Sequence, residues 1–115
     1  MEKVYDLEER TTRFAKAVIN LCKSLLRNPI NDRLIGQVVG SAGSVGANYR
    51  EANDALGRKD FLQRIKISRR EAKESIHWLE CILEANLLKK NELVLLLKEA
   101  DELKRIFSAI IINAK

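Results

Sequence analysis

The sequence has few of the residues that interrupt helices or build metal and catalytic sites. It contains one proline, Pro29, one histidine, His77, and two cysteines, Cys22 and Cys81, and aromatic residues make up only 5% of it. A di-iron bundle needs two Glu-x-x-His motifs, whereas this chain has one, residues 74–77, so we interpret His77 as a solvated surface residue. The cysteines lie far apart in helical patterns, which favours free buried thiols of a cytosolic protein over a disulfide.

Long apolar runs are also missing. No run reaches the roughly 20 residues that a membrane helix needs. Residues 34–49 carry no charge, but they include several polar side chains and are bounded by Arg33 and Arg50. The N-terminal residues are charged, so we expect no signal peptide. The sequence therefore predicts a soluble, cytoplasmic protein with no membrane partner.

Recognisable catalytic and nucleotide-binding motifs are absent as well. The segment GQVVGSAGSVGANYREAN, residues 36–53, holds four of the five glycines at spacings of four, three and three. This spacing fits neither the dinucleotide fingerprint nor the phosphate-binding P-loop, and no strand pattern precedes it. No Ser-His-Asp grouping occurs, and neither cysteine shares a motif with a histidine. We expect no enzymatic activity, no cofactor and no metal.

Helix-forming residues are abundant. Hydrophobic residues make up 46% and charged residues 32% of the 115-residue chain, with Ala, Leu, Ile, Glu, Lys and Arg dominant. Four amphipathic segments are predicted: residues 6–26, a helix from an Asn31 cap to about residue 53, roughly 58–88 with Gly57 as cap, and a fourth after an Asn91 cap. No strand-like alternation occurs. The sequence predicts one all-α domain over residues 1–115, an antiparallel up-down-up-down four-helix bundle.

Each predicted helix has an apolar stripe that should form the core. The stripes comprise Leu7, Thr11, Phe14, Val18, Leu21 and Leu25 in the first; Val38, Ala42, Val45, Tyr49 and Leu56 in the second; Phe61, Ile65, Ala72, Ile76, Leu79, Leu83 and Leu87 in the third; and Leu93, Leu97, Ala100, Leu103, Phe107, Ile110 and Ile111 in the fourth.

The second predicted helix has small residues opposite its bulky stripe. Gly36, Gly40, Gly43 and Ala47 share that side at about 100° per residue. Four helical glycines cost roughly 3–4 kcal/mol against alanine, which close approach of another helix would offset. That helix comes from the same bundle or from a neighbouring subunit, and the alternative is an exposed, poorly formed helix.

The third predicted helix carries a basic stripe. Net charge is +5, and one side of this helix presents Lys59, Lys66, Arg69, Arg70, Lys73 and His77. Such a row is able to follow a phosphate backbone of RNA or DNA. The alternative is a solvated helix face with Glu74 and Glu80 nearby, because no aromatic side chains are interleaved with the cations for base stacking.

A second apolar edge on the same helix indicates a subunit interface. Ile67, Trp78, Cys81 and Ala85 lie away from its core stripe. A small bundle has difficulty covering both edges, so we expect a homo-oligomer with interface candidates Gly40, Gly43, Ile67 and Trp78. The alternative is that a chain terminus covers Trp78.

Three segments together resemble a known family. SVGANYREA, residues 44–52, is similar to the S-[IV]-x-x-N-[IY]-x-E-[AG] signature of the four-helix-bundle proteins linked to intervening sequences in bacterial 23S ribosomal RNA genes. RKDFLQRIKISRREAKESIHWLE, residues 58–80, resembles the second block of that family, and ERTTRFAKAV, residues 9–18, its first helix. Gly57 and Gly40 depart from it, at positions where serine and arginine are usual.

The resemblance implies a fold and a range of partners. Family members look like up-down bundles that assemble as rings, often homopentamers. A related branch serves diversity-generating retroelements as accessory proteins that bind a reverse transcriptase and nucleic acid through a basic surface. For this chain the expectation is an oligomeric nucleic-acid-binding or accessory protein. The alternative is a protein–protein adaptor that binds no nucleic acid.

Polar residues of the signature call for partners of their own. Ser44, Asn48 and Glu51 lie on one helix, between its small and bulky faces. Half-buried polar groups must find hydrogen-bond partners, so we expect a structural polar network in preference to a ligand site. Glu51 is expected to pair with Arg50 of a neighbouring subunit or with a base of the third helix such as Arg69.

Overall fold

The computed structural model of the chain describes residues 6–114, and within them the fold is entirely helical. The elements in order are α1 (Leu7–Lys23), α2 (Pro29–Asn53), α3 (Arg58–Ala85), the short 3₁₀ helix η2 (Leu87–Lys89) and α4 (Lys90–Asn113). The prediction of four helices without strands is confirmed for this part of the chain.

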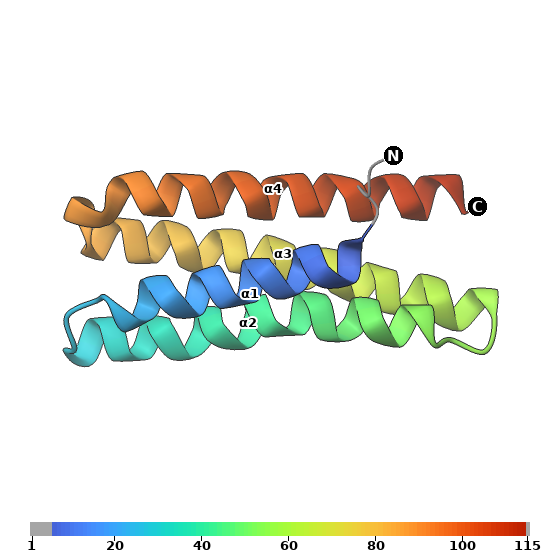
Figure 1. Cartoon of the computed structure of the whole chain (residues 1–115), viewed down its shortest axis with the longest axis horizontal. Helices are drawn as coiled ribbons and strands as arrows, with labels where there is room; N and C mark the ends of the chain where they lie inside the picture. The colour runs from blue at the N-terminus through green and yellow to red at the C-terminus, as the bar shows by residue number, and fades with distance from the viewer. Residues whose placement is uncertain (1–5, 115) are drawn as a thin grey trace.

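The four helices lie side by side in an elongated bundle of 45 × 29 × 19 Å. The α1–α2 and α3–α4 connections lie at one end of the bundle, and the α2–α3 connection lies at the other (Figure 1). The α2–α3 and α3–α4 pairs are the most extensively packed, whereas α1 and α4 have the fewest contacts of the neighbouring pairs. Helix α3 is therefore the central packing element, and one of its sides remains at the surface.

Side-chain caps mark the starts of α1 and α2. The Asp6 carboxylate accepts a hydrogen bond from the Glu9 N–H at 3.1 Å. The Asn28 side chain accepts one from the Asn31 N–H at 2.7 Å, and Pro29 follows as the first helical residue. The predicted cap at Asn31 is therefore wrong. The helix begins earlier because Pro29 has a φ suited to the first helical position, where the backbone N–H that proline lacks would have no partner within the helix.

The junction of α3 and α4 also differs from the prediction. Helix α3 ends at Ala85, three residues before the predicted end, and α4 begins at Lys90, so Asn91 is inside the helix and not its cap. The Asn86 amide explains the stop: its Nδ2 donates to the Ile82 carbonyl and to Asn31 Oδ1, both at 2.9 Å. Asn31 Nδ2 donates in turn to Asn86 Oδ1 and to the Leu26 carbonyl. This amide pair joins the two connections at one end of the bundle.

The apolar stripes form the core largely as predicted. All six residues of the first stripe are buried, and Ile65, Ala72 and Leu79 from α3 and Phe107 from α4 are almost completely inaccessible. Two predicted core residues are wrong: Leu87 is 64% exposed and Leu56 fully exposed. Both follow the end of a helix, where the helical periodicity that placed them no longer applies.

Small polar residues line the contact between α2 and α3. Ser68 Oγ donates to the Val45 carbonyl at 2.9 Å, and Ser75 Oγ donates to Ser41 Oγ at 3.0 Å. Ser68 and Ser75 are fully buried, so these bonds satisfy hydroxyls that would otherwise be costly. Residues 41 and 45 thus meet residues 75 and 68, which fixes the relative position of the two helices.

The one glycine that packs against another helix is Gly46. A Cβ at this position would lie 2.9 Å from Thr11 Oγ1 and 3.2 Å from Thr11 Cβ of α1. Thr11 is itself buried and donates from Oγ1 to the Leu7 carbonyl at 2.7 Å. Gly36, Gly40 and Gly43 have open space within 4 Å, so the predicted small face has no partner inside its own bundle.

Candidate functional site

Positive charge is concentrated in the first part of α3. Residues 58–73 include seven lysines or arginines and only two acidic residues, Asp60 and Glu71, whereas residues 74–85 include Glu74, Glu80 and Glu84 and no lysine or arginine. In the structure Lys59, Lys66, Arg70, Lys73 and His77 are exposed and Arg69 is half-buried. All six predicted binding residues therefore reach the surface.

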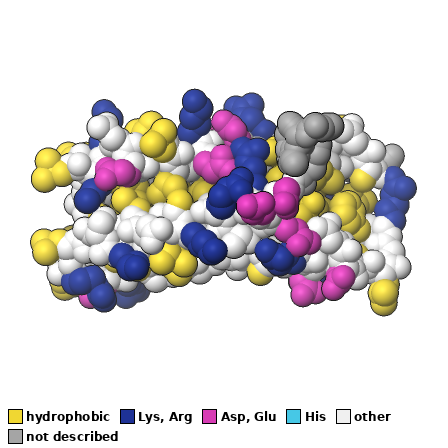
Figure 2. All heavy atoms as spheres, in the orientation of Figure 1, with side chains coloured by type: hydrophobic (Ala, Val, Ile, Leu, Met, Phe, Trp, Pro, Cys, Tyr) yellow, Lys and Arg dark blue, Asp and Glu magenta, His cyan; other side chains and the backbone are white. Residues whose placement is uncertain are grey.

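The cations of this stripe are unpaired within the described chain. The ion pairs elsewhere engage most other arginines with carboxylates: Arg10, Arg13, Arg27, Arg50 and Arg105. On the face that shows α1 in front, positive and negative side chains are intermixed (Figure 2). By contrast, the side chains of these cations make no ion pair or hydrogen bond with another described residue; they are Lys59, Lys66, Arg69, Arg70 and Lys73. Their charges remain available to an external anion.

The middle of the stripe borders a shallow open pocket on α3, here called the basic pocket. Its lining combines four cations with a carboxylate and two aromatic rings: Lys66, Arg69, Arg70, Lys73, Glu74, His77 and Trp78. The presence of Trp78 beside the cations was not expected from the sequence. Helical spacing could have indicated it, because Glu74 and Trp78 are four residues apart and therefore lie one turn apart on the same side of a helix.

The signature residues form a smaller network than expected. Asn48 Nδ2 donates to the Ser44 carbonyl at 3.0 Å, and Asn48 Oδ1 accepts from Arg64 at 3.0 Å. Arg64 is the partner that the sequence did not reveal, because it lies on α3. Asn48 therefore connects α2 to α3, as a structural role requires.

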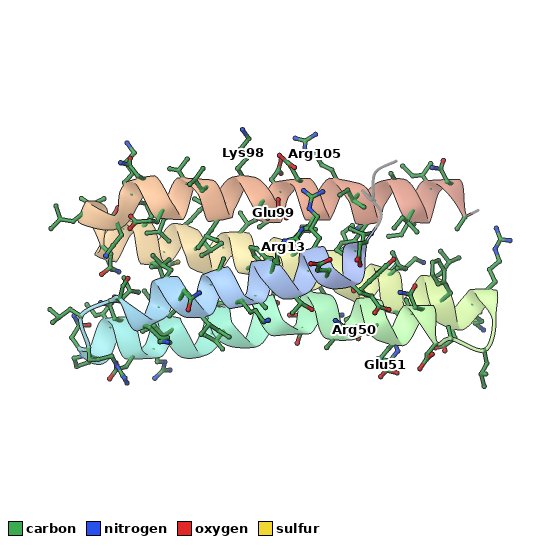
Figure 3. All side chains as sticks on the ribbon, in the orientation of Figure 1. Arg13, Arg50, Glu51, Lys98, Glu99 and Arg105 are labelled. Carbon is green, nitrogen blue, oxygen red and sulfur yellow. The ribbon has the colours of Figure 1, made fainter. Side chains whose placement is uncertain are left out.

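Glu51 does not join this network. It is exposed, and its carboxylate makes no hydrogen bond or ion pair with another described residue. Arg50, its expected partner in a neighbouring subunit, is bonded to Glu8 and Thr12 of its own chain, both at 3.0 Å. Figure 3 shows Glu51 on the outer edge of α2.

The expected interface residues lie on the outer surface of α2 and α3. Gly40 and Gly43 are exposed on α2, and Ile67 is half-buried on α3 without packing against the core. Trp78 is half-buried and does pack against the core. Trp78 also lines the basic pocket, so the expected interface and the pocket share this residue.

A carboxyl group of α3 and a thiol of α1 have raised pKa values. Burial, reinforced by the neighbouring Glu74 carboxylate, raises the pKa of Glu71 above its ordinary value. Burial also raises the pKa of the Cys22 thiol to about 11, which makes it an unreactive core residue. Both cysteines are free; Cys22 is buried as predicted, whereas Cys81 is only half-buried.

Metal sites and membrane-spanning helices were also sought in residues 6–114. No group of three or more His, Cys, Asp or Glu side chains in this range is arranged to hold a metal ion. No helix in the same range has the length and hydropathy to cross a membrane. The fold and surface define a class, an all-α protein of four bundled helices with an unpaired basic stripe on one of them.

Comparison with known proteins identifies the family within this class. The profile of the 23S rRNA-intervening sequence protein family matches residues 4–109, and the chain belongs to that family. A crystal structure of a protein of unknown function from the S23 ribosomal protein family of Bacteroides thetaiotaomicron VPI-5482 is similar in fold, with a TM-score of 0.79 and 28% sequence identity. The similarity covers 90% of this chain and 96% of that one. No curated protein matches the sequence.

Proposed function

We propose that the protein is a non-enzymatic, oligomeric nucleic-acid-binding protein of the cytoplasm, and that its basic stripe holds the phosphates. The observation that carries the proposal is the set of unpaired cations on α3, Lys59, Lys66, Arg69, Arg70 and Lys73.

The physical argument rests on where the charge is placed. A solvated helix face gains from alternating charge, as on α4, where Asp101 bonds both Lys104 and Arg105. Residues 58–73 instead collect like charges, which repel one another and raise the energy of the isolated protein. A polyanion removes this repulsion and releases its own bound counterions, so binding becomes favourable and strongly salt-dependent.

Assembly of the bundle multiplies this surface. We propose that the four helices form an antiparallel up-down-up-down unit and that copies of it associate into a ring, a pentamer by the family resemblance. The open space at Gly40 and Gly43 allows a neighbouring helix to approach α2 closely, and Ile67 supplies apolar surface beside it. A ring presents several basic stripes to one nucleic acid, so weak contacts add up to a higher overall affinity.

Filter binding with a salt titration tests nucleic-acid binding. Structured RNA and duplex DNA are bound to the wild-type protein at several salt concentrations. Four to five phosphate contacts on duplex DNA predict a slope of about −3.6 to −4.5 in the plot of log K against log salt concentration. Binding only at millimolar concentrations, or an affinity independent of salt, would contradict the proposal.

A protein–protein adaptor is the second candidate, and a separate observation favours it. Four aliphatic side chains are exposed at the end of the bundle where two connections meet: Leu26 at 76%, Ile30 at 64%, Leu87 at 64% and Leu88 fully. Hydrophobic side chains show at this end of the space-filling view (Figure 2). The Asn31–Asn86 amide pair holds the two connections together, so the four side chains belong to one apolar end. Exposed apolar patches of this kind are typical of contacts with other proteins.

Recovery of partners from the native host separates the two candidates. The tagged protein is captured with and without nuclease, and the same is done with Leu87→Ser/Leu88→Ser. A partner such as a reverse transcriptase that survives nuclease and is lost with the double variant supports the adaptor. Partners that disappear after nuclease and are retained by the variant support nucleic-acid binding.

A further inference from the structure

The one tryptophan of the chain lies beside the unpaired cations. The Trp78 indole lines the basic pocket on the surface of α3 together with Arg70 and Lys73. Nothing in a phosphate contact alone calls for an aromatic ring at this place, since phosphates are recognised by charge and N–H donors. An indole among cations is instead the combination that binds both the bases and the backbone of a nucleic acid.

The Trp78 ring is held in place before any ligand binds. One part of the side chain packs against the core, and the His77 ring stands against it at 70°, with ring centroids 4.7 Å apart. An aromatic pair at this angle and distance is a favourable arrangement. A ring fixed in this way loses little conformational freedom on binding, so it makes an effective stacking surface.

We propose that the basic pocket binds single-stranded nucleic acid, with one unpaired base stacked on Trp78 and the adjoining phosphates held by Arg70 and Lys73. The inference rests on the proposed nucleic-acid binding and adds the form of nucleic acid that this surface takes. It assigns Trp78 to the ligand, whereas the sequence placed it in a subunit interface.

Unpaired strands fit this pocket better than duplexes for a steric reason. In a double helix each base is covered above and below by its neighbours, so an indole on the protein surface has no base face to contact. In a single strand a base rotates out and stacks on an aromatic ring while its phosphates follow a basic groove. Lys66 and His77 lie eleven residues apart, about 16 Å along the helix, which suits a strand of a few nucleotides.

Glu74 supports the same orientation of the strand. Its carboxylate is part of the pocket lining, on the Trp78 side of the cations. A carboxylate repels phosphates but accepts hydrogen bonds from the N–H groups of a base. The base is therefore expected near Glu74 and Trp78, and the phosphates near Lys66, Arg70 and Lys73.

The presence of one tryptophan allows a direct experiment on the wild-type protein. Intrinsic fluorescence is recorded during titration with a ten-nucleotide oligouridylate, the same strand with abasic positions, and a blunt RNA duplex. The proposal expects strong quenching by the oligouridylate and little by the other two ligands. In parallel, binding of labelled oligouridylate is measured for Trp78→Leu, Trp78→Phe and the control Lys98→Gln. Loss of one stacked base weakens binding by about 5- to 150-fold, so Trp78→Leu should fall in that range, with Trp78→Phe in between and Lys98→Gln unchanged.

The results separate failure of this inference from failure of the proposed function. If the abasic strand and the duplex bind as tightly as the oligouridylate, without quenching, the cations bind nucleic acid but base stacking on Trp78 is wrong. If none of the ligands binds, the proposed function itself fails. If the emission of Trp78 changes on dilution of the protein and not with oligouridylate, the indole belongs to a subunit interface and the inference is overturned. The abasic comparison uses the unaltered protein, so it holds even if a Trp78 variant fails to fold.

Discussion

Replacement of Gly46 by alanine should destabilise the protein, although alanine is the better helix former. The new Cβ would lie 2.9 Å from Thr11 Oγ1 and 3.2 Å from Thr11 Cβ. Thr11 has little room to retreat, because it is buried and its hydroxyl is bonded to the Leu7 carbonyl at 2.7 Å. Overpacking of this kind costs about 1–3 kcal/mol, against a gain of about 1 kcal/mol in helix propensity.

Gly36→Ala is the matched control for this substitution. Gly36 lies in the same helix, and a Cβ there meets no atom within 4 Å. Both variants gain the same helix propensity, so the difference between them isolates the steric cost. We expect Gly46→Ala to be less stable than Gly36→Ala by about 1–3 kcal/mol in urea unfolding, or about 4–12 °C in melting temperature.

A second test uses the residue that causes the clash. In a Thr11→Ala background the closest atom, Oγ1, is absent, so the cost of Gly46→Ala should be visibly smaller, by about 1 kcal/mol. Equal stabilities of Gly46→Ala and Gly36→Ala, or the same cost of Gly46→Ala in both backgrounds, would refute the close contact between α1 and α2.

Three further predictions concern other contacts. Arg10 of α1 bonds Glu99 through two nitrogens and also bonds Glu102, both on α4, and α1 and α4 are the least packed of the neighbouring helix pairs. Arg10→Met should therefore cost about 1–3 kcal/mol in denaturant unfolding. The raised pKa of Glu71 means that this carboxyl group holds a proton more tightly in the folded state than in the unfolded state, so it lowers stability as pH rises through the folded-state pKa. In thermal melting, Glu71→Gln should therefore stabilise the protein at pH 7 and not at pH 3. Gly43→Leu should leave the monomer fold intact but reduce oligomer size in light scattering, whereas Gly43→Ala should not; an unchanged size for Gly43→Leu would contradict the proposed interface.

The core and the helices could be predicted from the sequence because they depend on short-range periodicity. The 3.6-residue repeat placed Phe14, Val18 and Leu103 in the core, where they are buried. The ends of the helices were harder to predict from the sequence, because they depend on individual side chains. Asn28 caps α2 in place of Asn31, and Asn86 ends α3 through bonds that include one to a residue 55 positions away.

Some features of the candidate site could likewise be predicted from the sequence, and others could not. The exposed stripe from Lys59 to His77 follows from helical spacing alone. The sequence could not show that these cations are unpaired, because pairing depends on which helices become neighbours, as for Arg50 with Glu8. The close approach at Gly46 and the bond from Arg64 to Asn48 also required the relative placement of two helices. All residues of the basic pocket lie on one helix, but their lack of ion-pair partners depends on how the other helices pack around it.

The most direct test of the central claim compares two double variants with the same net charge. Lys66→Gln/Lys73→Gln removes two cations from the stripe on α3, and Lys16→Gln/Lys98→Gln removes two exposed lysines from α1 and α4. Lys98 projects from the outer edge of α4, away from the other helices (Figure 3). Affinity for single-stranded RNA is measured over a range of salt concentrations. We predict that the α3 variant weakens binding and lowers the log–log salt slope by about 1.4, while the control keeps the wild-type slope. Equal losses in the two variants would show that net charge, and not the α3 stripe, attracts the RNA, and would contradict the account.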